Sequence, residues 1–222
     1  IKQRAYIPKS LTYSILRRLH DNSVNVLVPS LSMVEELERY NFKNLKVWNR
    51  GVDTELFNPN KRNRNDNDIQ LTYVGRVAIE KNIEEFLKLK GNYNKTVVGD
   101  GPELQKYIKK YPDVNFVGLK RGNELAEYYA NADVFVFPSK TDTLGNVILE
   151  ALACGTPIAA FPVTGPKDIL KDSKINTLDD KLGNSVEKAL KVNRNDCREF
   201  AMKFTWEDCA NEFLDSQIDS KN

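Results

Sequence analysis

The sequence contains few of the residues that build metal centres and disulfide frameworks, with three cysteines and one histidine in 222 residues. Cys154, Cys197 and Cys209 show no short metal-ligand spacing, and an odd number leaves one thiol unpaired in any disulfide scheme. Because free cysteine is among the most buried residue types, we expect three core thiols. His20 lies in a basic, helix-like stretch, LRRLHDN, where an exposed or structural histidine is more common than a catalytic base.

Long apolar runs and an excess of one charge are also missing. No segment approaches the ~20 uninterrupted apolar residues that span a bilayer, and the start lacks the pattern of a signal peptide. The 33 basic and 31 acidic residues give a formal net charge of +2, which carries no strong signal for nucleic acid. A composition of 41% hydrophobic and 29% charged residues is typical of a globular protein of one or two domains. We therefore expect a cytoplasmic protein with no nucleic-acid partner.

Short apolar runs alternate with longer segments of helical period, which predicts repeated strand-helix units and a parallel sheet. Strands over 24–29 and 45–48 flank a helix over 30–40 with Ser32 as its N-cap. A turn-rich, charged segment then places a domain boundary near 58–67. The predicted strands after it are 69–75, 95–99, 114–118, 133–138 and 157–161, and the predicted helices are 79–89, 103–110, 123–130 and 145–153. This order predicts a doubly wound sheet, followed by helices from Asp179 onward. The chain opens on Ile1 with no element that completes a small domain before it, so we expect the later part of a longer protein.

Polar residues follow the first two predicted strands of this sheet, at the edge where such sheets bind ligands. Gly75 and Arg76 come directly after the first strand, and Lys81 enters the next helix. An arginine and a lysine converging there form a natural diphosphate clamp, although two solvated surface cations would give the same letters. Gly99 ends the second strand, in GDGP. It would let a ligand approach backbone amides, but a strand-to-helix turn with Pro102 at the helix start explains it equally well.

The stretch TDTLGNVILEALACGTP, residues 141–157, is the most informative. Gly145 and Asn146 open a helix whose N-terminal amides and dipole suit a phosphate. Glu150 lies over one turn further along and can face the same cleft, where a carboxylate accepts two hydrogen bonds from a ribose diol. Asp142, just before the turn, is placed to hold a second polyhydroxylated group. A capping Asp and an exposed helical Glu are the alternative. Against an exposed Glu150, its neighbours on both sides are apolar, and an acid is rarely buried without a partner.

Four stretches, RGVDTELFNP, GRVAIEKN, GDGP and TDTLGNVILEALACGTPIAA, together resemble family 4 of the retaining glycosyltransferases, enzymes of the two-domain GT-B fold. The resemblance runs from about Val26 to Ile218. It implies an α/β, Rossmann-like doubly wound parallel sheet in residues 68–178 as the nucleotide-sugar (donor) domain. It further implies that residues 1–58 are the last part of a second Rossmann-like domain, which binds the acceptor, together with the crossover, and that residues 179–222 are C-terminal helices.

The resemblance also implies a role for each candidate residue. Arg76 and Lys81 match the pair that holds the donor diphosphate, and Glu150 matches the acid that binds the nucleotide ribose. Asp142 matches the first acid of the paired-acid motif, which contacts the hydroxyls of the donor sugar, so Arg76, Lys81 and Asp142 are the candidate catalytic residues. The backbone expected to bind the nucleotide lies after the strands and at the helix start, around Gly75, Gly99, Leu119, Lys120, Leu144, Gly145 and Asn146. Two residues depart from the family pattern. Asp142 stands where Glu is more frequent, which leaves the donor's identity open, and Leu144 stands where Phe is frequent.

The implied reaction moves a sugar from a nucleoside diphosphate to an acceptor hydroxyl with retention, and needs neither a metal nor another cofactor. The phrases TDTLGN and KVWNRGVDTELF look most like bacterial members, and a lipid or cell-envelope glycan acceptor with peripheral contact at the inner face of the membrane is compatible with them. The alternatives are a nucleotide-sugar-binding module without transfer activity, and an epimerase or phosphorylase of the same fold. No stretch marks the lysine that a phosphorylase needs for pyridoxal phosphate. The sequence leaves the base, the sugar, the acceptor and the oligomeric state open.

Overall fold

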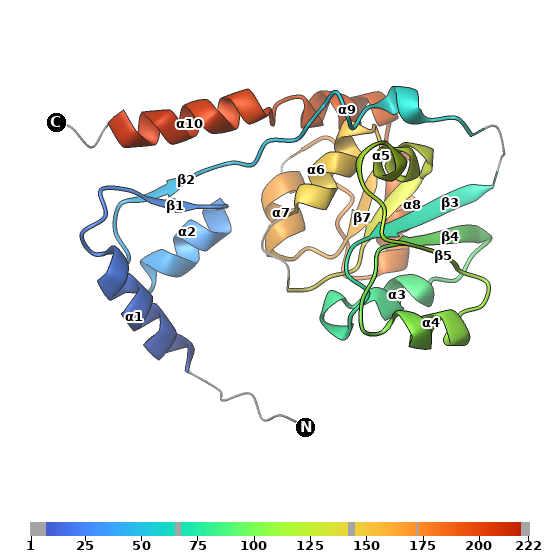
Figure 1. Ribbon diagram of the computed structural model, residues 1–222, viewed down its shortest axis with the longest axis horizontal. Helices are drawn as coiled ribbons and strands as arrows, with labels where there is room; N and C mark the ends of the chain where they lie inside the picture. The colour runs from blue at the N-terminus through green and yellow to red at the C-terminus, as the bar shows by residue number, and fades with distance from the viewer. Residues whose placement is uncertain (1–7, 65–67, 142–144, 172, 219–222) are drawn as a thin grey trace. The chain divides into compact units, whose positions relative to one another are not determined.

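The structure, a computed structural model, describes residues 8–64, 68–141, 145–171 and 173–218 (Figure 1). The chain divides into two compact units. One combines the described residues up to Arg50 with those from Glu207 onward, and the other is Gly51–Trp206. Each unit has its own sheet.

The smaller unit is built around two short parallel strands, β1 (Val26–Val28) and β2 (Leu45–Val47). Its helices are α1 (Lys9–His20), α2 (Leu31–Glu38) and nearly all of α10 (Trp206–Ile218). The predicted strands and the helix between them are confirmed, but the cap is Ser30, not Ser32. The extended Ser30 accepts a hydrogen bond from the N–H of Met33 (3.3 Å), which satisfies a first-turn donor.

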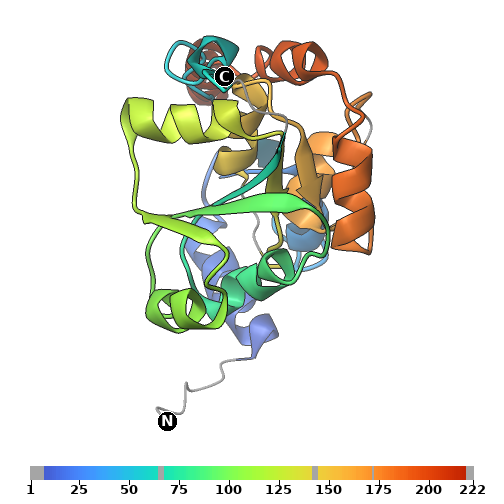
Figure 2. The same ribbon diagram turned by 90° about the vertical axis from the view of Figure 1, so that its right-hand side faces the viewer.

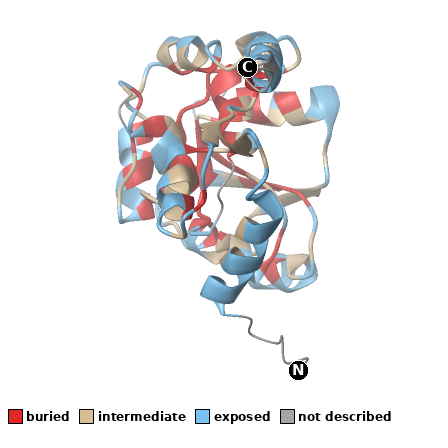
Figure 3. Cartoon of the chain, turned by 90° about the vertical axis from the view of Figure 1, so that its left-hand side faces the viewer, coloured by how far each residue is buried: buried red, intermediate tan, exposed pale blue. Residues whose placement is uncertain are grey.

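Helix α1 is the most exposed element of the smaller unit, as Figure 3 shows, and none of its residues is buried. The core of this unit is instead Val28, Leu37 and Phe42. On the C-terminal helix, the carbonyl oxygen of Cys209 accepts a hydrogen bond from Trp48 Nε1 (2.8 Å). Across the described part of the chain, no helix combines the length and the apolar character that crossing a bilayer requires.

The larger unit contains a five-stranded parallel sheet in the order β5-β4-β3-β6-β7. The strands are β3 (Ile69–Val74), β4 (Tyr93–Val98), β5 (Asn115–Gly118), β6 (Val134–Phe137) and β7 (Ile158–Ala160). The chain builds outward from β3 to β5, returns to β6 beside β3, and continues in the opposite direction. This order confirms the predicted doubly wound sheet and places its switch point between β3 and β6.

Helices cover both faces of this sheet (Figure 2). They are α3 (Ile83–Leu87), α4 (Leu104–Lys110), α5 (Gly122–Asn131), α6 (Asn146–Ala153), α7 (Thr164–Leu170), α8 (Leu182–Ala189) and α9 (Arg194–Ala201), with 3-10 turns η1 (Pro59–Lys61) and η2 (Ile79–Lys81). One core joins α5, α6 and α9 to the sheet through residues such as Phe135 and Leu152. The other core joins α3, α4 and α8 to the opposite face through residues such as Leu71 and Phe86.

The structure differs from the sequence prediction in three places. The helix predicted over 79–89 is interrupted at Asn82, whose left-handed backbone (φ 52°) separates η2 from α3. Helix α7 was not predicted. The compact unit begins ahead of the charged segment at 58–67, because Val52 and Phe57 are buried in its core, and it continues through α8 and α9, which pack on the same sheet and helices.

Candidate functional site

Two loops meet at the switch point of the larger sheet. The loop after β3 carries Gly75, Arg76 and the turn η2, and the loop after β6 begins at Pro138. Asn82, at the end of η2, donates a hydrogen bond from Nδ2 to the carbonyl oxygen of Pro138 (2.9 Å). A second, longer contact joins the hydroxyl of Thr141 to the carbonyl oxygen of Glu80 (3.4 Å). The two strand ends that flank the switch point are therefore tied to each other.

A pocket of about 290 Å³ lies at these strand ends. Its lining residues are Tyr73, Val74, Gly75, Arg76, Lys81, Phe137, Ser139, Asn146 and Val147. The structure thus brings together Gly75, Arg76, Lys81 and Asn146, which lie up to 71 residues apart in the sequence. The position agrees with the rule that open α/β sheets bind ligands beyond the carboxyl ends of the strands.

The polar side of this pocket carries positive charge. The Arg76 guanidinium is 3.3 Å from a Glu80 carboxylate oxygen, but both side chains are more than half exposed, so this surface pair contributes little to stability. Lys81 ends η2 and is half-buried. Helix α6 begins at Asn146, and the start of a helix contributes first-turn N–H groups and the positive end of its dipole. An anion with several oxygens fits this arrangement.

The side chain of Tyr73 fixes the backbone of the loop after β3. Its hydroxyl donates a hydrogen bond to the carbonyl oxygen of Arg76 (2.8 Å). Gly75 has a φ of 153°, and its N–H donates to the carbonyl oxygen of Val98 at the end of β4 (3.0 Å). This glycine positions Arg76 at the pocket edge, and its own amide already has a partner in the sheet.

Gly99 serves the close packing of neighbouring loops. Its N–H donates to the carbonyl oxygen of Gly118 (2.8 Å), and a Cβ added at Gly99 would lie 1.9 Å from the carbonyl oxygen of Gly75. Its φ of 143° also lies where side chains are rarely tolerated. Of the two explanations for GDGP, these contacts favour the strand-to-helix turn over a backbone amide that binds a ligand.

Glu150 lies on the second turn of α6 and is half-buried. Its Oε2 accepts a hydrogen bond from the hydroxyl of Tyr129 on α5 (2.8 Å), and it does not line the pocket of about 290 Å³. Burial raises the pKa of the Glu150 carboxyl, and the Tyr129 hydrogen bond opposes this rise. Burial and the neighbouring carboxylate also raise the pKa of Tyr129 well above its ordinary value. A carboxylate has about four acceptor positions, so this bond leaves capacity for ligand hydroxyls.

The remaining predicted residues do not line the pocket or lie outside the described part of the chain. Gly145 precedes α6 and is buried, and an added Cβ would meet side-chain atoms of Ile148 and Ile169 at 2.9 and 3.0 Å. Leu119 is exposed after β5, and Lys120 pairs with Glu124 on α5 (3.4 Å). Asp142 and Leu144 lie outside the described residues.

Sequence reasoning missed Tyr129 and Ser139. Tyr129 lies in an ordinary amphipathic helix, and no pattern links it to an acid 21 residues later. Ser139 follows a buried strand, where a serine is expected in a turn. Its side chain is 1% exposed, and its hydroxyl has no hydrogen-bond partner among the described residues.

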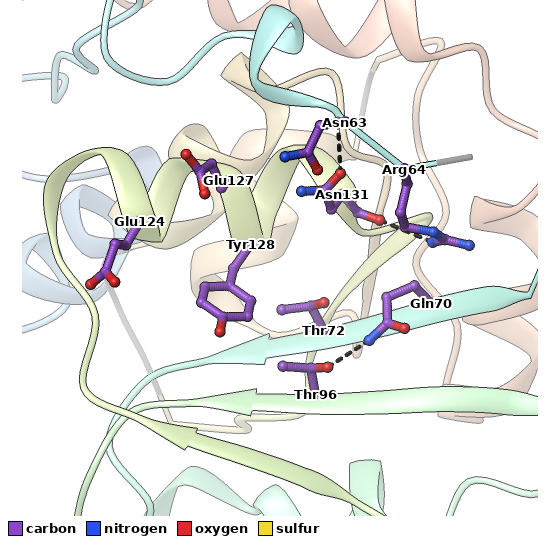
Figure 4. A pocket seen from close by; sticks show the side chains of 9 residues that line it. All are labelled: Asn63, Arg64, Gln70, Thr72, Thr96, Glu124, Glu127, Tyr128 and Asn131. Atoms are coloured by element: carbon purple, nitrogen blue, oxygen red, sulfur yellow. Dashed lines mark hydrogen bonds between the residues drawn. The ribbon is translucent and has the colours of Figure 1, made fainter. Parts of the chain in front are cut away.

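A second pocket, of about 300 Å³, lies between α5 and the strands β3 and β4 (Figure 4). Figure 4 shows Tyr128 pointing from α5 toward Thr72 and Thr96. Gln70 donates to Thr96 Oγ1 (2.5 Å), and Asn131 Oδ1 accepts from the N–H of Asn63 (3.0 Å). Some of its polar groups therefore bond to one another, and none of the predicted site residues lines it.

The expected core thiols are confirmed, since Cys154, Cys197 and Cys209 are all free and buried. Burial raises the pKa of Cys154 and of Cys197 to about 12. Among the described residues, no three His, Cys, Asp or Glu side chains gather into a group that could hold a metal ion.

Comparisons with known proteins agree with this geometry. The family described as "Glycosyl transferases group 1" matches residues 55–203. The sulfoquinovosyl transferase SQD2 of Arabidopsis thaliana is 35% identical over 181 residues, which cover 73% of this chain and 35% of that protein. A GDP-mannose-dependent alpha-mannosyltransferase of Mycobacterium tuberculosis is 33% identical over 171 residues, which cover 73% of this chain and 45% of that protein.

Among solved structures, Anabaena HepE in complex with UDP-glucose superposes with a TM-score of 0.75 at 15% identity, over 96% of this chain and 68% of that one. Such a likeness shows the fold, and the GT-B, Rossmann-like α/β fold expected from the sequence is confirmed. The chain spans less than half the length of the two curated relatives.

Proposed function

The chain belongs to the group 1 glycosyl transferases, and we propose that it carries the nucleotide-sugar site of a retaining glycosyltransferase. The reaction moves a sugar from a nucleoside diphosphate to an acceptor hydroxyl. One observation carries this proposal: Arg76, Lys81 and the start of α6 at Asn146 meet along one pocket at the switch point of the sheet. The name of the M. tuberculosis relative and the ligand of Anabaena HepE support a nucleotide-sugar donor.

The proposed chemistry is electrostatic. As the bond between sugar and diphosphate breaks, negative charge grows on the leaving phosphate oxygens. Fixed positive groups lower the barrier when they stabilise this charge more strongly in the transition state than in the ground state. Arg76 can grip two oxygens with its planar guanidinium, Lys81 adds a point charge, and the N-terminus of α6 adds its dipole. We therefore propose that the reaction proceeds without a metal ion.

The other donor contacts follow the resemblance. Glu150 accepts hydrogen bonds from the ribose, Asp142 contacts hydroxyls of the sugar, and the exposed Leu119 offers an apolar surface to the base. The family likewise implies front-face attack with retention. We propose a lipid or cell-envelope glycan as the acceptor, and a cytoplasmic protein with peripheral contact at the membrane.

Calorimetry on the 222-residue chain with UDP and GDP tests the donor site. We expect weak but measurable binding of one of them, and a loss of roughly tenfold or more in affinity in both Arg76→Ala and Lys81→Ala, because each removes a charged contact. Lys88→Ala is the matched control, since Lys88 pairs with Glu84 outside the pocket. A wild-type chain that binds neither these two nor the other nucleoside diphosphates, or two variants that bind like the control, would contradict the proposal.

A nucleotide-sugar-binding module without transfer activity would pass that test. Mass spectrometry of the complete protein, incubated with a panel of nucleotide-sugars and a lipid extract, separates the two functions. A glycosylated lipid or glycan supports the transferase, release of free sugar from the donor alone supports the epimerase, and binding without any product supports the module. The anomeric configuration of the product, measured by NMR, tests retention.

A further inference from the structure

The buried hydroxyl of Ser139 is the unexplained polar group of the pocket. Ser139 is the second residue after β6, its side chain is 1% exposed, and it lines the pocket together with Arg76, Lys81 and Asn146. Its Oγ is buried and has no hydrogen-bond partner among the described residues.

The same unit shows how buried hydroxyls are normally satisfied. Ser185 is also fully buried, and its Oγ donates to the carbonyl oxygen of Thr177 (2.8 Å) and accepts from the N–H of Ala160 (2.9 Å). Thr156 donates to the carbonyl oxygen of Tyr129 (2.6 Å). Because a buried polar group without a partner is unfavourable, such a group calls for an explanation, and at a pocket a ligand that supplies the missing bond is one.

The surroundings of Ser139 select the chemistry of that ligand. Arg76 and Lys81 carry only hydrogen-bond donors, and the start of α6 at Asn146 presents backbone N–H groups. A hydroxyl can donate as well, so the set is complementary to an anion whose oxygens only accept. A sugar hydroxyl would need acceptors in return. Of the two acids assigned to hydroxyl groups, Glu150 does not line this pocket and Asp142 lies outside the described residues.

We propose that the Ser139 hydroxyl donates a hydrogen bond to a phosphate oxygen of the nucleoside diphosphate, between the two cations and the start of α6. This inference rests on the proposed function and adds a neutral, buried donor to its charged ones. Unlike Arg76, whose guanidinium is exposed, Ser139 is fixed by burial at the end of β6. It therefore positions the phosphate without a large loss of side-chain freedom.

The test is Ser139→Ala in the 222-residue chain, with UDP, GDP and inorganic pyrophosphate as probes. A role in packing and a role in binding predict opposite results. Without ligand, we expect an unchanged or higher melting temperature, because the variant removes an unsatisfied buried group. For pyrophosphate and for the nucleotide that binds the wild type, we expect Kd to rise roughly tenfold to a hundredfold, the effect of a hydrogen bond to a charged group. Ser173→Ala, which removes a hydroxyl that bonds to the carbonyl oxygen of Leu170 and does not line the pocket, should leave each Kd unchanged.

Each outcome decides between the two proposals. An unchanged Kd for every probe in Ser139→Ala overturns the Ser139 assignment and leaves the donor site intact. A rise for a nucleotide but not for pyrophosphate also overturns it, because the lost contact is then not to phosphate. Wild-type binding of pyrophosphate without any nucleoside diphosphate refutes the donor function, while the pyrophosphate series still tests Ser139. Failure of the wild type to bind any probe refutes both.

Discussion

Tyr129→Phe tests whether the Glu150 carboxylate depends on the hydrogen bond that the structure shows. The phenylalanine keeps the ring and its edge-on contacts with Phe57 and Phe135, with centroids 5.8 and 5.4 Å away, so the change removes only a hydroxyl. A hydrogen bond to a charged group is worth about 1.5–3 kcal/mol. Because Glu150 is only half-buried, we expect the lower part of this range at pH 8. At 2–4 °C per kcal/mol for a domain of this size, the melting temperature should fall by about 3–8 °C.

The loss should depend on pH in a defined direction. The pKa of Glu150 is raised above its ordinary value by burial, so between the unfolded and the folded pKa the folded state binds more protons. The free energy of unfolding therefore decreases as pH rises through that window. Removing the Tyr129 bond raises the folded pKa further and deepens the decrease. At pH 4, where the raised pKa favours the protonated carboxyl, the variant loses mainly a neutral hydrogen bond, about 1 kcal/mol or less.

Urea denaturation of the wild type and of Tyr129→Phe at pH 4 and pH 8 measures the loss in free energy of unfolding at each pH. Glu150→Gln provides the control background, because an amide accepts from Tyr129 but does not titrate. In that background the effect of Tyr129→Phe should be the same at the two pH values. An equal loss at pH 4 and pH 8 in the wild-type background would refute the argument that Tyr129 supports a charged Glu150.

Three further changes test the site and its supports. EDTA should leave the activity of the complete enzyme largely intact, since Arg76 and Lys81 are proposed to neutralise the diphosphate; activity lost on chelation and restored by magnesium or manganese would contradict this. Gly99→Ala should lower the free energy of unfolding by about 3 kcal/mol or more in urea titrations, because its Cβ would lie 1.9 Å from the carbonyl oxygen of Gly75. Arg198→Ala should cost about 3 kcal/mol in the same assay, because it strands three backbone carbonyls that the guanidinium now binds; a loss below 1 kcal/mol would show that water replaces it.

The alternation of apolar runs was sufficient to predict the sheet of the larger unit. All five of its strands were expected, because strands buried on both faces give continuous apolar runs such as DVFVFP, and the helices between them carry a clear period. Helix α7 was missed because Gly165 and Pro166 predict a turn, whereas a proline is tolerated in the first turn of a helix. The division into compact units could not be predicted from composition. A charged, turn-rich segment resembles a linker, but residues before it can still pack on the core, as Phe57 does.

The candidate site was predictable only where its residues share short motifs. Arg76 and Lys81 lie in one stretch, and Asn146 opens a helix that the sequence marks with a glycine. Tyr129 and Ser139 were not predictable from the sequence. Tyr129 matters because its hydroxyl contacts Glu150, and Ser139 matters because its buried hydroxyl has no partner among the described residues. Asn82 is similar: its left-handed backbone and its bond to Pro138 link two loops that are 56 residues apart.

The motif after β3 contains two kinds of residue that the sequence alone does not separate. Gly75 is held in the sheet by its N–H, while Arg76, the next residue, extends into solvent at the pocket edge. Burial tells the two roles apart, because an exposed cation can be removed with little effect on folding, whereas the close backbone approach at Gly99 tolerates no added atom. Loss of affinity without loss of stability is therefore the signature of a ligand contact in this site. By that criterion Ser139 is the informative exception. It is buried like a structural residue, but its substitution is expected to lower affinity without lowering stability, as for a residue that contacts the ligand.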